Sequence, residues 1–258
     1  MVSQEDHRTF EVGVGISILG IPVHAVSLEK TLEVLDQAIE AGTRMRIVTL
    51  NPEMIMGAQT DQRLARAICG ADLTVPDGVG VVWAMRWKGI KGQIRIAGVD
   101  LIENLLDRRR HRHKQRLKLF LLGGRPGVAS EAGERMKLRW PFVEVVGSRH
   151  GYFSVEDNEE VLQEVNNAAP DLLLVGMGLP KQELWLAEHW ERLHVKLAVG
   201  IGGGLNLWAG RIKRAPQLVR RMGLEWLFRT FHEPQRITRL KALPRFVLEV
   251  FWEARSER

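Results

Sequence analysis

The segment LKLFLLGGRPGVASEAGERMKLR at 117–139 contains, in order, an apolar run, a glycine turn and a helical pattern. Similar pairs of a short apolar run and a helical pattern recur along the first 205 residues. This alternation is typical of a parallel sheet with helices on both faces. The sequence therefore predicts an α/β, Rossmann-like core with a mainly parallel sheet. We expect its strands near 12–18, 46–50, 72–75, 117–122, 143–147, 171–176 and 196–201.

Capping residues set the expected helix boundaries. Ser27 precedes a helical pattern that Gly42 ends, Asn51 stands before a proline, and Asp77 stands before another helical pattern. Short polar side chains favour the N-cap of a helix, proline favours its first turn, and glycine favours its end. We therefore expect N-caps at Ser27, Asn51 and Asp77. The expected helices cover 28–41, a segment starting at 52, 78–88, 98–110, 127–139, 155–168 and 181–191.

The composition is that of an ordinary soluble globular chain, with 258 residues of which 45% are hydrophobic and 26% charged. The single cysteine, Cys69, excludes an intrachain disulfide and a thiolate zinc site, and it suits a reducing, cytoplasmic compartment. The N-terminus lacks a signal sequence, and no stretch approaches the roughly 18 apolar residues of a spanning helix. We expect a protein that does not cross a membrane.

The positive charge lies in the last fifth of the chain. Residues 206–258 hold 12 Lys or Arg against 5 Asp or Glu, whereas residues 1–205 hold 25 against 26. After Gly210 no strand pattern follows, and three prolines divide the rest into helical pieces rich in aromatic residues. Basic residues among large apolar ones suit an anionic surface, and the alternative is a helical subdomain or a subunit interface in a homo-oligomer. We predict a core at 1–205 and an all-helical appendage at 206–258.

The common nucleotide and metal motifs are missing. Three Gly-x-Gly segments, at 13–15, 176–178 and 200–202, have Ile18, Lys181 and Leu205 where GxGxxG needs its third glycine. The chain also lacks GxxxxGK[ST], HExxH and DxD. These absences argue against an NAD(P)-dependent oxidoreductase and a P-loop enzyme. The sequence predicts neither a metal site nor a cofactor.

Polar residues and glycines follow several of the expected strands, and in open α/β sheets ligands bind at the carboxyl ends of strands. Asp77 at such an end suits a general base, although a helix cap explains it as well. The glycine turns at 123–127 and 200–204 suit close backbone approach to a diphosphate, and they equally suit a tight turn and a hinge. The dipole of the helix starting at 181 favours Glu183 but not Lys181, which indicates a ligand for Lys181.

Six segments occur in a recognisable order: TLNPE at 49–53, ADLTVPDGVGVVW at 71–83, AGVDL at 97–101, FLLGGRPGV at 120–128, VGMGLPKQELW at 175–185, and GIGGGLNLWAGRIKRAP with GLEWLFRTFHEPQR within 200–236. Together they closely resemble the WecG/TagA/CpsF family of bacterial glycosyltransferases over about residues 15–240. The resemblance implies transfer of a sugar from a UDP-sugar to a polyprenyl-diphosphate-linked saccharide in surface polysaccharide synthesis, with inversion and without an essential metal. N-acetylmannosamine, N-acetylmannosaminuronic acid and glucose are donors within the family.

The resemblance also implies roles for matching residues. Asp77 stands at the candidate general base, Thr49 and Asn51 line the same pocket, and Gln182 matches a residue near the substrate. The C-terminal segment matches a membrane-targeting appendage whose arginines meet a diphosphate. The predicted catalytic residues are Asp77, Thr49, Asn51 and Gln182; those for donor and diphosphate binding are Gly123, Gly124, Arg125, Gly176, Gly178, Lys181, Glu183, Gly202, Gly203 and Arg214; those for membrane and acceptor are Arg221, Arg229, Arg236 and Trp226.

The chain departs from the family at Leu205-Asn206, where many relatives have an aromatic residue and an aspartate, and this departure bears on donor choice. Nucleic-acid binding is the main alternative function, since a basic, aromatic tail also suits phosphate backbones. Against it, the charge is confined to one helical segment and no RNA- or DNA-binding module is present. We expect a UDP-sugar, a polyprenyl-diphosphate acceptor and an anionic membrane as partners, no nucleic acid, and a place on the inner face of the cell membrane.

Overall fold

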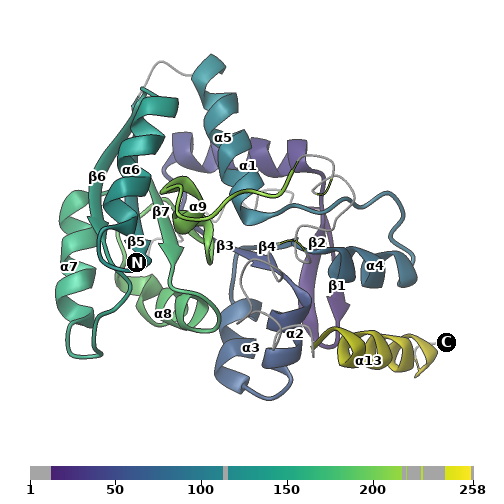
Figure 1. Ribbon diagram of the computed structural model, residues 1–258. Coiled ribbons are helices and arrows are strands. Elements are labelled where there is room, and N and C mark those ends of the chain that lie inside the picture. Colours follow the sequence, from purple (N-terminus) through teal and green to yellow (C-terminus); the bar gives the residue numbers. More distant parts are fainter. Residues whose placement is uncertain (1–12, 113–115, 217–218, 220–227, 229–241, 257–258) are drawn as a thin grey trace, which may run out of the picture.

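Six parallel strands form the central sheet of the protein in the order β4-β3-β8-β7-β5-β6 (Figure 1). The computed structural model describes residues 13–112, 116–216, 219, 228 and 242–256. The predicted α/β class and the six strands expected from residue 46 onward are confirmed. The strands are β3 (Met45–Leu50), β4 (Leu73–Pro76), β5 (Leu117–Gly123), β6 (Val143–Arg149), β7 (Leu172–Gly176) and β8 (Leu197–Gly200).

Helices cover both faces of this sheet (Figure 1). Side chains alternate along a strand, so Ile47 packs in the core beneath α1, α5, α6 and α9, while Val48 packs in the core on the other face. The helices α2, α3, α7 and α8 cover that second face. The helices are α1 (Leu28–Ala41), α2 (Pro52–Ala58), α3 (Gln62–Cys69), α4 (Val79–Trp87), α5 (Gly98–Arg112), α6 (Val128–Arg139), α7 (Asn158–Ala168), α8 (Lys181–His189) and α9 (Gly204–Trp208).

Two of the three predicted N-caps are confirmed. The Ser27 side chain accepts a hydrogen bond from the backbone N–H of Lys30, and Asn51 caps α2 in the same way. The predicted cap at Asp77 is wrong, because Gly78, with φ of 107°, is the N-cap of α4 and no side chain caps this helix. The positive φ turns the chain between Asp77 and the helix, so Asp77 remains at the end of β4. Helix α3, which Asp61 caps, is an element that the sequence analysis missed.

The N-terminal strand does not join the parallel sheet, which corrects the expectation for 12–18. Strand β1 (Val14–Ile18) pairs antiparallel with β2 (Ile21–Ala25), a strand that had not been predicted, in a separate two-stranded sheet. The two-residue turn at Leu19-Gly20 has positive φ at both positions, as tight hairpin turns require. The first turn position is a leucine instead of the Gly, Asn or Asp that is typical of such turns, so the sequence does not predict this hairpin.

The last described element, α13 (Ala242–Ser256), packs on α2 and α4 through one apolar stripe of Phe246, Val250 and Ala254. This helix begins before Pro244, which had been expected to divide two helical pieces. The short helix α9 spans the expected domain boundary, and Leu205 lies in the main core. In the described part of the chain, no helix is both long and apolar enough to cross a membrane.

Candidate active site

A cavity of about 710 Å³ lies at the carboxyl ends of the parallel strands. The chain passes from β3 outward to β4 on one side and from β5 outward to β6 on the other, so the strand order reverses within the sheet. Open α/β sheets bind their ligands at such a reversal. Asn51 and Asp77, which follow β3 and β4, form with Thr49 the side-chain wall of the cavity. Glycines after β5, β7 and β8 form the glycine wall, at Gly124, Gly176, Gly178, Gly200, Gly202 and Gly203.

The side-chain wall is held rigidly by the backbone. The N–H of Asp77 donates to the carbonyl oxygen of Leu50 at 2.7 Å, which fixes the end of β4 against β3. Asn51 both caps α2, through the N–H of Met54 at 3.0 Å, and lines the cavity. The Thr49 hydroxyl lies 3.5 Å from the carbonyl oxygen of Gly200. A half-buried carboxylate on a fixed strand end is well placed for proton transfer to a bound molecule.

The glycine wall depends on close approach of three loops. The N–H of Gly124 donates to the carbonyl oxygen of Gly176 at 3.1 Å. A Cβ atom on Gly176 would lie 2.9 Å from the carbonyl oxygen of Gly202, and one on Gly123 would lie 2.4 Å from that of Gly176. Side chains would therefore separate the loops, and only glycine permits this packing.

Lys181 brings a positive charge to the glycine wall. Its Nζ donates to the carbonyl oxygen of Gly151 at 2.9 Å and lies 4.7 Å from the centre of the Phe153 ring. An ammonium group has three N–H donors, so it can hold Gly151 and a ligand at once. Arg125, which is exposed, lines the same side of the cavity.

Gln182 and Glu183 lie in the first turn of α8, where they line the cavity next to the glycine wall. Gln182 Oε1 accepts hydrogen bonds from the N–H groups of Gly178 at 3.2 Å and Gly202 at 3.0 Å. Its Nε2 donates to Glu183 Oε1 at 2.7 Å. Glu183 is 4% exposed, and burial raises its pKa to about 7, although the hydrogen bond from Gln182 acts in the opposite direction. The two side chains thus tie the loops after β7 and β8 together.

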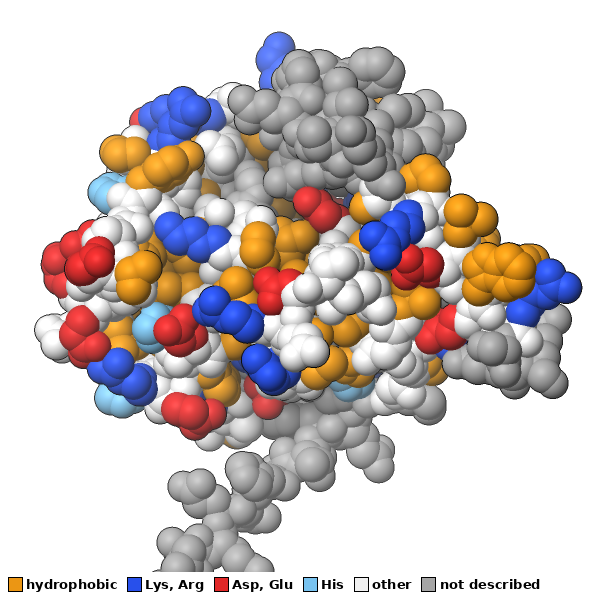
Figure 2. Space-filling view, turned by 90° about the horizontal axis from the view of Figure 1, so that it is seen from below, with side chains coloured by type: hydrophobic (Ala, Val, Ile, Leu, Met, Phe, Trp, Pro, Cys, Tyr) orange, Lys and Arg blue, Asp and Glu red, His pale blue; other side chains and the backbone are white. Residues whose placement is uncertain are grey.

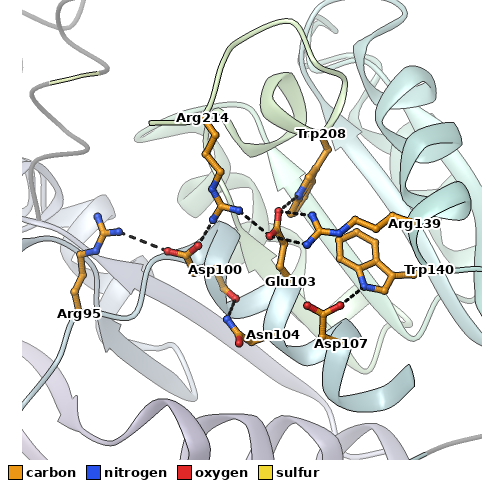
Figure 3. Close-up of polar contacts among 9 residues, drawn as sticks. All are labelled: Arg95, Asp100, Glu103, Asn104, Asp107, Arg139, Trp140, Trp208 and Arg214. Atoms are coloured by element: carbon orange, nitrogen blue, oxygen red, sulfur yellow. Dashed lines mark hydrogen bonds and ion pairs between the residues drawn. The ribbon is translucent and has the colours of Figure 1, made fainter. Parts of the chain in front are cut away.

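A network of charged side chains fixes the end of α9 to α5 beside the cavity (Figure 3). Arg214 forms ion pairs with Asp100 and, at 2.7 Å, with Glu103. Glu103 also accepts a hydrogen bond from Trp208 Nε1 at 3.1 Å. Burial alone would raise the pKa of Glu103, but the hydrogen bond and charge of Arg214, with Trp208 and Arg139, outweigh burial and lower it. Arg95 completes the network, 3.5 Å from Asp100.

Most of the predicted site residues meet in this cavity. Gly123 does not line it but packs beneath Gly176. The sequence analysis missed Arg95, Asp100 and Leu243; of these only Asp100 lies in a segment that had been singled out. The predicted residues Arg221, Trp226, Arg229 and Arg236 lie outside the described residues. Those that line the cavity are Thr49, Asn51, Asp77, Gly124, Arg125, Gly176, Gly178, Lys181, Gln182, Glu183, Gly202, Gly203 and Arg214.

A cavity with glycine turns, a rigid carboxylate and a lysine at the carboxyl ends of a parallel sheet defines an enzyme of the nucleotide-binding α/β class. Residues 16–258 match the model of the glycosyl transferase WecG/TagA/CpsF family. The chain belongs to this family and is a glycosyltransferase. Membership decides between the readings of the sequence, in favour of a transferase over an oxidoreductase or a nucleic-acid-binding protein. Across the described residues, no three His, Cys, Asp or Glu side chains form a group that could hold a metal ion.

Two relatives carry the same descriptive name, N-acetylglucosaminyldiphosphoundecaprenol N-acetyl-beta-D-mannosaminyltransferase. The protein from Bacillus spizizenii is 35% identical to this chain over 210 residues, which cover 81% of this chain and 80% of the relative. The protein from Staphylococcus aureus strain MRSA252 is 33% identical over 237 residues, which cover 91% of each chain. The similarity to both relatives therefore extends over most of the chain.

Proposed function

We propose that this enzyme transfers N-acetylmannosamine from UDP-N-acetylmannosamine to N-acetylglucosamine that is linked through a diphosphate to undecaprenol, in the synthesis of a cell-surface polymer. The names of the two relatives support this sugar and this acceptor over a glucose or uronic acid donor. The observation that carries the proposal is that the side-chain wall and the glycine wall line the same cavity. Asp77 follows β4 and Gly124 follows β5, four strand spacings or roughly 19 Å apart, which leaves room for a sugar beside a nucleotide.

Asp77 is the proposed general base. Its carboxylate takes the proton from the acceptor hydroxyl as that oxygen attacks the anomeric carbon. The new bond forms on the face opposite the diphosphate, the bond from the anomeric carbon to the phosphate oxygen breaks, and UDP leaves with its electron pair. A positioned base contributes about 10²–10⁴-fold to such a reaction. An α-linked donor then gives a β-linked product, as the names of the relatives describe.

The glycine wall is the proposed diphosphate site. Negative charge develops on the leaving UDP, and backbone N–H groups with a nearby cation stabilise such charge. Lys181 and Arg125 supply cations at this wall, and Gly124, Gly202 and Gly203 allow the backbone to approach the phosphates. Arg214 also lines the cavity, but Asp100 and Glu103 balance its charge, so we assign it to the shape of the site.

The membrane contact is proposed to include an aromatic patch on α4 and α13, formed by Trp87, Phe251, Trp252, Leu248 and Val247. Trp252 is 64% and Leu248 60% exposed, and the rings of Trp87 and Phe251 lie 5.9 Å apart. The end of α13 lies at the right of Figure 1, and Figure 2 shows apolar and basic side chains together on that side of the molecule. Tryptophan beside arginine is typical of surfaces that enter the headgroup region of a bilayer. The enzyme would then reach its lipid-linked acceptor at the membrane surface.

Vesicle pelleting tests the membrane contact. The double variant Trp87→Ala/Trp252→Ala should bind vesicles of anionic phospholipid several-fold more weakly than the wild type, because it removes exposed aromatic area. The control is Leu138→Ala on α6, a residue that is 84% exposed and lies far from α13 (Figure 1). Equal binding of the wild type and the double variant would remove the aromatic patch from the proposal.

Release of UDP tests the proposed reaction. A panel of UDP-sugars is combined with a short-chain polyprenyl-diphosphate N-acetylglucosamine in the presence of EDTA. We expect release that requires the acceptor and is fastest with UDP-N-acetylmannosamine. Faster release with another UDP-sugar would identify that sugar as the donor in place of UDP-N-acetylmannosamine. Loss of release in EDTA would contradict metal independence. No release with any donor would contradict the proposed acceptor.

A further inference from the structure

Glu183 is a buried carboxyl group at the cavity with a hydrogen bond on one oxygen only. The side chain is 4% exposed and lines the cavity. Oε1 accepts from Gln182 Nε2 at 2.7 Å, whereas Oε2 is buried and has no hydrogen-bond partner among the described residues. A buried carboxylate with an unsatisfied oxygen is strongly disfavoured, and a carboxyl group in such a place keeps its proton instead.

The Gln182 amide is held between two backbone N–H groups and the Glu183 carboxyl group. Backbone N–H groups only donate, so the atom of Gln182 that meets Gly178 and Gly202 is its oxygen. The amide nitrogen must then find an acceptor on its other side, and Glu183 Oε1 supplies it. Gly178 and Gly202 belong to the loops after β7 and β8 that line the cavity. Glu183 therefore acts on the glycine wall through Gln182.

The charged groups around Glu183 come from two other elements. Glu53 in the first turn of α2 raises the pKa of Glu183, and Arg46 of β3 lowers it, but both effects are smaller than that of burial. The resulting pKa is about 7. No histidine or cysteine lines the cavity within the described part of the chain. Glu183 thus stands out as a lining group that titrates near neutral pH.

We propose that Glu183 is a positioning residue that fixes the Gln182 amide, and that donor binding requires its protonated, uncharged form, which keeps negative charge away from the diphosphate of the donor. That the bound anion is the donor diphosphate rests on the proposed function, whereas the protonation of Glu183 does not. When Glu183 loses its proton, a negative charge appears next to the glycine wall. Donor binding then weakens as the pH rises through neutrality.

The protonation is tested first in the protein without ligand. Carbon NMR of protein labelled at the glutamate carboxyl carbon follows each carboxyl group with pH, and the signal absent from Glu183→Gln belongs to Glu183. The expected result is a titration with its midpoint near pH 7. A midpoint below about pH 5, as for ordinary glutamates, would overturn the proposal.

The effect on the donor is tested by the dissociation constant of UDP-N-acetylmannosamine at pH 6.5 and 8.5, without acceptor. If only the protonated form binds, the wild type weakens by up to about 25-fold over this range, given a pKa of about 7. Glu183→Gln is uncharged at both pH values, so its affinity should change less than about twofold. The control Glu188→Gln, at an exposed position of α8, should keep the wild-type pH dependence. Equal pH dependence in Glu183→Gln and the wild type would overturn the proposal.

Steady-state kinetics separates positioning from a merely structural role. Glu183→Ala leaves Gln182 Nε2 without its acceptor, so we expect the donor KM to rise about tenfold or more with a smaller change in kcat, and we expect Glu183→Gln to recover most of that loss. Equal losses in the Ala and Gln variants would contradict positioning through this hydrogen bond. If UDP-N-acetylmannosamine binds no variant at either pH, the proposed donor is wrong, and the NMR titration still decides whether Glu183 is protonated.

Discussion

The two walls of the cavity differ in which part of the chain they present. The side-chain wall presents a carboxylate, an amide and a hydroxyl from Asp77, Asn51 and Thr49, each at the end of a strand on one side of the sheet. The glycine wall presents backbone, and its close packing leaves no space for a Cβ atom at Gly176 or at Gly123, which packs beneath it. We therefore expect proton transfer to depend on the side-chain wall and donor binding to depend on the glycine wall. Substitutions on one wall should impair one task and largely preserve the other.

The largest expected effect is on catalysis by the side-chain wall. Asp77→Asn keeps the size of the side chain and removes its capacity to take a proton, so kcat should fall by about 10²–10⁴-fold. The affinity for UDP-N-acetylmannosamine, measured by calorimetry, should change little because the glycine wall is intact. Unchanged kcat would exclude Asp77 as the base. Loss of donor binding would contradict the claim that the side-chain wall serves catalysis and the glycine wall serves donor binding.

Substitutions that disturb the glycine wall should reduce donor binding and fold stability. Gly123 has φ of 143°, and a Cβ atom there would lie 2.4 Å from a backbone oxygen, so Gly123→Ala should destabilise the fold by about 2–3 kcal/mol and weaken donor binding. The control is Gly20→Ala in the hairpin turn, where φ is 78° and, among the described residues, no atom beyond the adjacent residues lies within 4 Å of the added Cβ. This control should cost about 1 kcal/mol, from backbone strain alone, and should leave donor binding intact. Urea denaturation and calorimetry measure both quantities, and equal losses in the two variants would contradict the close packing of the wall.

The network beside the cavity should affect stability with a defined pH dependence. Glu103→Gln removes the charge that pairs with Arg214, which should cost about 2 kcal/mol at pH 7. The folded-state pKa of Glu103 lies below its ordinary value, so this stabilisation is present above an unfolded-state pKa of about 4.3 and disappears as the pH falls through the folded pKa.

The stability difference between the wild type and Glu103→Gln should therefore shrink in denaturation at pH 3. The matched control is Glu131→Gln, whose ion pair with Arg211 is exposed, and it should change stability much less. A cost at pH 3 as large as that at pH 7 would show that the charge of Glu103 is not the cause.

The smallest expected effect is that of a single cation at the glycine wall. Lys181→Met keeps much of the side-chain volume and removes one charge-assisted hydrogen bond, so donor affinity should fall by about tenfold. The loss should be smaller at high salt, where the charge of Lys181 is screened. Lys137→Met, on the exposed side of α6, is the control and should bind the donor as the wild type does. Wild-type affinity in Lys181→Met would place the diphosphate elsewhere.

Local sequence signals predicted the strands and helices that have strong periodicity or clear caps. The helix over 28–41 has a Ser27 cap and a Gly42 end, and its bounds are those of α1. The hairpin at Leu19-Gly20 was missed because a leucine with positive φ is rare and leaves no turn signal. Asp77 was expected to cap the helix that follows it, because aspartate is a favoured N-cap residue. No local pattern in the sequence indicates that Gly78 takes this position instead.

The candidate site was predictable where a strand end and a polar residue adjoin in the sequence. Arg95 reaches the cavity through tertiary packing beside β4, and nothing local distinguishes it from other surface arginines. Glu183 was expected to contact a ligand's diphosphate, yet its side chain is only 4% exposed and packs against the backbone of Gly200 in β8. Burial of a charged residue depends on elements distant in sequence, which explains why its role emerges only from the fold.

The most direct test of the division between the walls is a crystal structure of the enzyme with UDP-N-acetylmannosamine. We predict that the diphosphate lies within hydrogen-bonding distance of the glycine wall and of Lys181 Nζ, with the anomeric carbon of the sugar turned toward Asp77. A diphosphate placed beside Asp77, with the sugar against Gly176 and Gly202, would contradict the account.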